Sequence, residues 1–216
     1  MNKITLKELE LKAFRSTYQD GLWDMYFGLI VICMAIFLYR PATGFSPMNI
    51  VLMLVSMIGA YALFWAGKRF ITLPRMGQVK FGKKRARRKK TMFLVLGAVV
   101  LIQIAFLVIQ SVAWRNPEFG DMLNTFLKEK NAMDLAVATI GSLFVGPSII
   151  LIAYFMDFPR GYFIGVMMAL AVFLMILLNQ PIYSIIIGIL IAAPGVVQFV
   201  RFLQKYTLRG KNSDHE

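Results

Sequence analysis

Apolar residues in this chain gather in long uninterrupted stretches instead of alternating with polar ones. Six stretches follow one another, at 22–39, 48–66, 92–114, 133–155, 161–178 and 182–200. Each is close to the roughly 20 residues that an α-helix needs to cross the ~30 Å hydrocarbon core of a bilayer. Only the polar turn Asn179-Gln180-Pro181 separates the last two. The pattern therefore predicts an all-α polytopic membrane protein with six transmembrane helices.

Polar segments flank and interrupt these stretches. Near the N-terminus, Leu11, Phe14 and Tyr18 recur at helical spacing among charges of both signs. This pattern predicts a short amphipathic helix on the cytoplasmic membrane surface, with a helix packed against protein as the alternative. The predicted organisation is an N-terminal helix, a six-span bundle with a basic loop inserted, and a basic, polar cytoplasmic tail, at 1–21, 22–200 (loop 67–91) and 201–216.

The loop between the second and third stretches is strongly basic. Residues 68–90 contain 11 Lys or Arg and no acid. Two runs rich in β-favouring residues flank Pro74, Arg75 and Gly77, which predicts a small β-hairpin that turns at these three residues. The run that follows, 83–90, is too charged to bury. We expect it to extend the third helix into the cytoplasm or to remain mobile.

Basic residues divide unequally between the two sides of the predicted bundle. With the N-terminus in the cytoplasm, 20 of the 24 Lys and Arg residues fall on cytoplasmic segments, as the positive-inside rule requires. Trp23, Trp65 and Trp114 lie at the ends of stretches, where aromatic rings anchor helices to the membrane interface. Charged residues make up only 16% of the chain, against about 25% in soluble domains. We expect a multi-pass protein of the cell membrane with both termini cytoplasmic.

Side chains that carry enzyme chemistry are scarce. His215 is the only histidine, and Cys33 is the only cysteine. The sequence lacks an HExxH zinc-peptidase pattern, a GxSxG elbow and a Gly-rich phosphate loop. Asp24, Asp134 and Asp157 each lie within about one turn of the end of a stretch, where we expect them to be solvated or to cap a helix. We therefore expect no enzyme activity, catalytic residue, metal or cofactor.

Two other sets of residues interrupt the apolar stretches. Gln103 and Gln110 are seven residues apart in the third stretch, so they share one helix face. We expect them to form interhelical hydrogen bonds, and lining a polar path is the alternative. Pro147 and Pro194 lie inside the fourth and sixth stretches, where we expect kinks that free backbone carbonyls.

Two short segments support a family resemblance. The segments are Asp20–Leu29, DGLWDMYFGL, and Thr72–Gly82, TLPRMGQVKFG. Together they resemble a group of small prokaryotic integral membrane proteins that carry a Thr-x-Pro-Arg-x-Gly-x-Val-x-Phe segment between two spans. The resemblance implies that the hairpin is a designed feature of the loop, with Pro74, Arg75 and Gly77 as its turn. It implies no activity, cofactor or site residue.

Charge on one face is the clearest functional feature of the sequence. We expect a non-enzymatic membrane protein whose basic cytoplasmic face binds anionic lipid headgroups or a protein partner, which includes a second copy of the chain. The expected contact residues are Lys83, Lys84, Arg85, Arg87, Arg88, Lys89 and Lys90. A small transporter or channel for a small solute is the alternative. Nucleic-acid binding is not expected, because topology already explains the charge.

Overall fold

The structure is a computed structural model that describes residues 18–38, 47–76, 83–113, 125 and 132–206. Over these residues the chain is helical and contains no β-strand. The long helices are α2 (Leu22–Leu38), α3 (Pro47–Ala66), α5 (Lys83–Ala113), α7 (Ala132–Phe155), α8 (Arg160–Leu177) and α9 (Ile182–Lys205). Among the described residues, five helices are long and apolar enough to cross a membrane, and α2, with 17 residues, is shorter, so the count of six spans stays a prediction. These features are those of a polytopic membrane protein.

Helix boundaries follow the apolar stretches closely. α7 and α8 begin one residue before the predicted stretches. The predicted turn between the last two stretches is confirmed, because α8 ends at Leu177, α9 begins at Ile182, and Asn179 between them has a φ of 49°. α5 begins at Lys83, so the charged run 83–90 extends the third helix. Of the predicted N-terminal helix, residues 1–17 lie outside the described part, and 18–21 form a turn.

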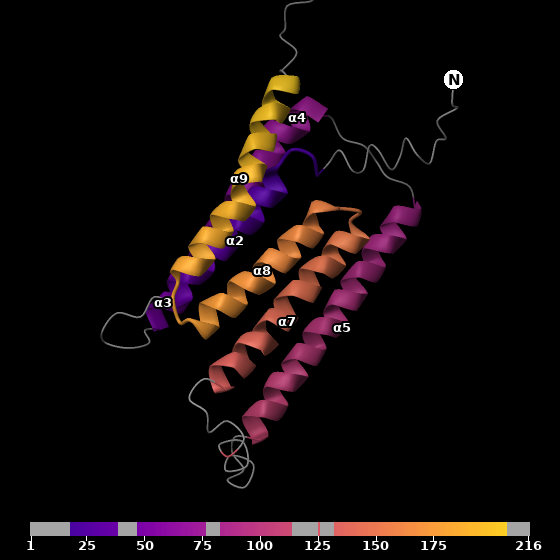
Figure 1. The fold of residues 1–216 in the computed structure, drawn as a ribbon. Helices are drawn as coiled ribbons and strands as arrows, with labels where there is room; N and C mark the ends of the chain where they lie inside the picture. Colours follow the sequence, from indigo (N-terminus) through magenta and orange to yellow (C-terminus); the bar gives the residue numbers. More distant parts are fainter. Residues whose placement is uncertain (1–17, 39–46, 77–82, 114–124, 126–131, 207–216) are drawn as a thin grey trace, which may run out of the picture. The chain divides into compact units, whose positions relative to one another are not determined.

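The chain divides into two compact units, and the first comprises residues 1–81 and 185–216. In this unit α9 runs alongside α2 (Figure 1). Glycines allow the two backbones to touch: a Cβ on Gly28 would lie 2.6 Å from the carbonyl oxygen of Gly188, and one on Gly21, directly before α2, would collide with the carbonyl oxygen of Gly195. Both pairs are seven residues apart on each helix, so α2 and α9 cross as antiparallel helices through small residues.

The second unit comprises residues 82–184 and contains α5, α7 and α8. The three helices lie side by side, with α7 between the other two (Figure 1). α7 and α8 form an antiparallel pair that also meets at glycines, since a Cβ on Gly146 would lie 2.8 Å from the Cβ of Ala169. The turn between them passes through Asp157, whose φ is 51°, a left-handed conformation that Asp tolerates better than most residues.

The predicted β-hairpin is wrong where the structure describes it. The first arm is a π-helix, η1 (Gly67–Thr72), which continues α3 without a break and leads into the short helix α4 (Leu73–Met76). Pro74 lies within α4, and Gly77 lies outside the described residues. Proline lacks an amide hydrogen, so an upstream carbonyl loses its partner, and a local π-turn is one adjustment that satisfies it. Hydrogen bonds from η1 to Asp20 and from α4 to the end of α9 also stabilise the helical form.

Candidate functional site

A buried polar cluster joins α2 to the π-helix in the first unit. Asp20, Lys68 and Thr72 make up this Asp20 cluster, in which the Asp20 side chain is fully buried. The Lys68 ammonium donates to Asp20 Oδ2 at 2.6 Å, and the Thr72 hydroxyl donates to the same oxygen at 2.8 Å. Two opposite charges therefore share one site, and the hydroxyl satisfies a further lone pair of the carboxylate. A buried carboxylate needs such partners, because burial without them is costly.

Local sequence explains how the cluster forms. The Leu22 amide donates to Asp20 Oδ1 at 3.3 Å, which satisfies one of the amides at the start of α2 that lack partners within the helix. Gly21 follows with a φ of 75° and turns the chain into α2 beside α9. On η1, Lys68 and Thr72 reach the same carboxylate, and the Leu73 amide bonds the Lys68 carbonyl. Asp20 thus fixes both the start of α2 and the π-helix.

The cluster also connects the two segments that carry the family resemblance. Asp20 begins the first segment and Thr72 begins the second, and their side chains are hydrogen-bonded. From the second segment, Arg75 Nη1 donates to the carbonyls of Leu203 at 3.2 Å and Tyr206 at 2.9 Å. These carbonyls lie at the C-terminal end of α9, where a cation is favourable. The sequence predicted Arg75 in a hairpin turn. In the structure Arg75 belongs to α4, and its guanidinium bonds carbonyls at the end of α9.

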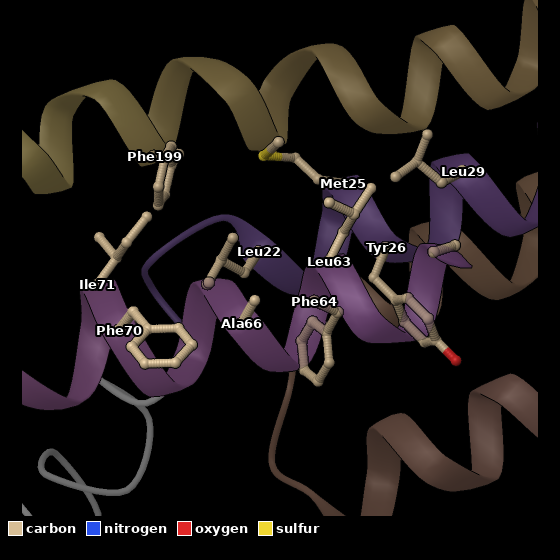
Figure 2. A pocket seen from close by; sticks show the side chains of 12 residues that line it. Leu22, Met25, Tyr26, Leu29, Leu63, Phe64, Ala66, Phe70, Ile71 and Phe199 are labelled. Carbon is tan, nitrogen blue, oxygen red and sulfur yellow. The ribbon is translucent and has the colours of Figure 1, made fainter. Parts of the chain in front are cut away.

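An apolar groove of about 480 Å³ lies beside the Asp20 cluster. Its walls come from α2, α3, η1 and α9, and the lining residues are Leu22, Met25, Tyr26, Leu29, Ala60, Leu63, Phe64, Ala66, Gly67, Phe70, Ile71 and Phe199. In Figure 2, Ile71 and Phe199 lie at one end, and Tyr26 and Leu29 lie at the other. The Tyr26 hydroxyl, the only polar side-chain group among them, points away from the other lining residues.

Aromatic contacts make one wall of the groove. The ring centroid of Phe64 lies 4.6 Å from that of Trp23 and 4.9 Å from that of Tyr26, distances at which aromatic pairs contribute beyond their buried area. Leu22, another lining residue, packs against η1, since a Cβ on Gly67 would lie 3.1 Å from its Cδ2. The amide of this same Leu22 bonds Asp20. The cluster therefore helps to hold the shape of the groove.

In the second unit, the basic start of α5 is partly tied to the α7–α8 turn. Arg88 donates to Asp157 Oδ2 at 2.7 Å and to the Tyr154 carbonyl at 2.7 Å. Arg87, Lys89 and Lys90 are exposed. The predicted contact residues Lys83, Lys84 and Arg85 belong to the helix, but their side chains lie outside the described part. Of the predicted basic surface, the structure therefore describes three exposed cations and one that is internally paired.

The remaining candidate residues are spread over both units. Gln103 Nε2 donates to the Phe144 carbonyl at 3.4 Å, a long bond between α5 and α7, as the interhelical interpretation expects. The side chain of Gln110 lies outside the described residues. Pro147 and Pro194 are incorporated in α7 and α9, and both side chains are exposed. Gln103 and Pro147 belong to the second unit, and Pro194 belongs to the first.

The three acids differ in their surroundings. Asp134 is exposed in the first turn of α7, as expected for a solvated residue. Asp157 is half-buried in its ion pair with Arg88. Asp24 is only 3% exposed, in the first turn of α2, and a Cβ on Gly195 of α9 would lie 2.8 Å from its Cβ. Of the two roles expected for Asp24, solvation is wrong, because α9 covers the residue, and capping of α2 stays a prediction.

Sequence reasoning missed the Asp20 cluster and the groove. Lys68 was counted among the loop cations, and Asp20 was assigned to the polar N-terminal segment. One signal was present, since an Asp-Gly pair directly before an apolar helix is typical of a helix start. Among the described residues, no group of three His, Cys, Asp or Glu could hold a metal ion. No protein-family model, curated protein or solved structure matches the chain.

Proposed function

We propose that this protein is a non-enzymatic integral membrane protein whose basic segment, residues 83–90, binds anionic lipid headgroups on the cytoplasmic side. The observation that supports it most is the exposure of Arg87, Lys89 and Lys90 in a helix that runs directly into an apolar span. A rigid helix holds these cations next to the point where the chain enters hydrocarbon. Their charged groups therefore lie at the depth of lipid phosphates.

The expected affinity follows from the number of exposed cations. Each basic residue near an anionic membrane surface contributes about 1 kcal/mol, so three together give about 3 kcal/mol, or roughly a hundredfold enrichment of anionic lipid. Arg88 adds less, because Asp157 already neutralises it. Salt screens such exposed charges, with a Debye length of about 8 Å at physiological ionic strength. The enrichment should therefore fall as salt is raised.

The cytoplasmic placement comes from the charge distribution. The same 20-to-4 bias of basic residues that predicts both termini inside also puts this segment inside. The cytoplasmic leaflet is the one that carries a negative surface potential. The positive charge of residues 83–90 and their predicted cytoplasmic location therefore both favour anionic lipid as the ligand. A transporter function draws no support from Gln103, whose amide bonds Phe144, or from the exposed Pro147 and Pro194.

The test removes only the exposed cations. The triple variant Arg87→Gln/Lys89→Gln/Lys90→Gln leaves Arg88 and the other basic residues of the loop to hold topology. The purified protein is mixed with phosphatidylglycerol and phosphatidylcholine, and bound lipid is measured at low and physiological salt. The proposal expects loss of phosphatidylglycerol enrichment and of its salt dependence.

A matched control removes the same charge on the opposite side of the predicted topology. The variant Arg115→Gln/Lys128→Gln/Lys130→Gln should retain the enrichment. Equal loss in both variants would attribute the effect to net charge and contradict a site at 83–90. Full retention in the first variant would leave the basic segment as a topology signal alone, or as a surface for a protein partner.

A further inference from the structure

The apolar groove of the first unit has the properties of a lipid-chain site. Its volume of about 480 Å³ falls within the range of small-molecule pockets, about 300–1,000 Å³. Its lining is apolar apart from the Tyr26 hydroxyl, which points away from the other lining residues (Figure 2). Apart from Tyr26, no side chain of this lining can offer a polar ligand a hydrogen bond. An occupant must therefore be apolar along the length that the groove encloses.

The depth of the groove in the membrane further restricts which molecules can occupy it. The candidate span that carries most of the wall, Met48–Arg75, is 28 residues long. At 1.5 Å per residue it is about 42 Å long, against a hydrocarbon core of about 30 Å and a total of about 40–45 Å with the headgroup regions. If Met48 lies at the outer edge of one headgroup region, the lining residues Ala60–Ile71 run from near the middle of the hydrocarbon core to its edge in the far leaflet. Arg75 then lies among the headgroups of that leaflet.

A cation with further hydrogen-bond donors lies one helical turn beyond one end of the groove. Arg75 comes one turn after Ile71 and bonds the carbonyl of Leu203, which comes one turn after Phe199. Ile71 and Phe199 are the pair at that end of the groove (Figure 2). Both described bonds use Nη1, and a guanidinium has three further N–H donors on Nη2 and Nε. Arginine binds phosphate oxygens well through such donors.

Lys68 is a second cation near the groove, but it is less available to bind a phosphate. Lys68 is next to Gly67 of the lining, but its ammonium bonds the fully buried Asp20 carboxylate at 2.6 Å. The Asp20 cluster is therefore close to neutral, whereas Arg75 carries its charge to the end of α9, one turn beyond Ile71 and Phe199. The charge pattern thus matches an amphiphile with one anionic group next to an apolar chain.

We propose that the groove binds one acyl chain of an anionic phospholipid from the surrounding bilayer, with the phosphate held by Arg75. The proposal goes beyond the basic segment, because α5 supplies no residue to this groove. It predicts a saturable site for a single lipid, in contrast to the diffuse enrichment expected at residues 83–90. Chain and headgroup are recognised by different residues, so each half can be tested separately.

Tryptophan quenching by a brominated acyl chain reports occupancy directly. The Trp23 ring lies 4.6 Å from the ring of Phe64, a lining residue, so Trp23 is the natural reporter once Trp65 and Trp114 are changed to Phe. The full-length chain is reconstituted in phosphatidylcholine vesicles, and phosphatidylglycerol with brominated chains is titrated in. We expect saturable quenching of Trp23. Ala66→Phe, which fills the groove, should abolish the saturable part.

Ala62→Phe is the matched control, because Ala62 is exposed on the same helix and does not line the groove. In Ala62→Phe, Trp23 fluorescence should be quenched to the same extent as in the parent protein. If Ala66→Phe does not fold, Leu63→Phe replaces it, since Leu63 is 68% exposed and a larger ring there enters the groove from its open side. Equal quenching in the filled and control variants would overturn the chain site.

The headgroup half is tested by Arg75→Gln and Arg75→Lys. Arg75→Gln should raise the half-saturating concentration of brominated phosphatidylglycerol by about fivefold or more, in line with one lost cation–headgroup contact. Arg75→Lys should retain part of the affinity that Arg75→Gln loses. Neither variant should change quenching by brominated phosphatidylcholine. An equal shift for both lipids would mean that Arg75 acts only on the fold.

This experiment also separates the two lipid sites. The triple variant Arg87→Gln/Lys89→Gln/Lys90→Gln should leave the saturable quenching of Trp23 unchanged, even where it reduces total anionic lipid. Loss of Trp23 quenching in that variant would contradict the groove proposal and assign the lipid to the basic segment.

Discussion

Breaking the Asp20–Lys68 pair should be among the most damaging changes to this fold. Asp20 is fully buried and the Lys68 side chain is 18% exposed, with 2.6 Å between Oδ2 and Nζ. Removing one member of a buried pair leaves an uncompensated charge and costs about 3–5 kcal/mol. We use the lower end, about 3 kcal/mol, because the Lys68 side chain retains some exposure. Asp20→Asn and Lys68→Met should each lower the free energy of unfolding by about that much.

A double-mutant cycle isolates the pair itself. Once one charge is gone, removing the other relieves the uncompensated group, so the double variant should cost about as much as either single one. The coupling energy is then about 3 kcal/mol, the upper end for contacting residues. Thr72→Val should cost about 1.5–3 kcal/mol, as one hydrogen bond to a charged group is lost. Its hydroxyl donates to the same Oδ2.

Unfolding in mixed detergent micelles, followed by far-UV circular dichroism, measures these differences. Arg69→Met is the matched control, because Arg69 is exposed on the same π-helix and carries the same charge as Lys68. It should change stability by less than about 0.5 kcal/mol. The reasoning fails if Lys68→Met and Arg69→Met behave alike, or if the two single effects simply add in the double variant.

Two further predictions concern the helix contacts in each unit. Gly28→Ala should destabilise the protein by about 1–3 kcal/mol through overpacking, because its Cβ would lie 2.6 Å from the Gly188 carbonyl. At Gly59 an added Cβ meets nothing within 4 Å, so Gly59→Ala should be neutral or should stabilise the protein by up to about 1 kcal/mol through helix propensity. If the thermal midpoints of Gly28→Ala and Gly59→Ala fall equally, the close packing of α2 and α9 is contradicted. Asp157→Asn keeps a residue that tolerates the φ of 51° and should cost under about 1 kcal/mol, since Arg88 is 37% exposed. A larger shift of the midpoint, or one that does not shrink in high salt, would contradict a partly solvated ion pair.

The long apolar helices could be predicted because continuous runs of apolar residues mark them in the sequence. α7 and α8 each begin within one residue of the apolar stretch that predicted them, since a bilayer requires a continuous apolar run of fixed length. The turn at Asn179 was predictable for a related reason, as polar residues and a proline interrupt that run.

The π-helix was not predictable from local preference. Phe70, Ile71 and Thr72 favour strands when read locally, and Pro74 is typical of a turn. Bonds to distant residues decide the conformation instead: Thr72 donates to Asp20, 52 positions earlier, and Arg75 donates to Tyr206, 131 positions later. Such contacts outweigh a propensity difference of at most about 1 kcal/mol.

The candidate site was hidden for the same reason. Lys68 resembles the other loop cations in the sequence, and only the fold shows that it is paired with Asp20. Arg88 likewise belongs to a uniform basic run, yet its position opposite Asp157 separates it from Lys89 and Lys90. The groove depends on four helical segments that converge on it, which no single stretch of sequence encodes.

The central claim is that this chain crosses the membrane with its basic loop on the cytoplasmic side. Cysteine labelling tests it most directly in a background where Cys33 is changed to Ser. An impermeant thiol reagent added to intact cells should modify a cysteine placed at Asn124, between α5 and α7, and leave one placed at Ala86 unmodified until the membrane is opened. Modification of the Ala86 position in intact cells, with protection of Asn124, would contradict the orientation and the function proposed from it.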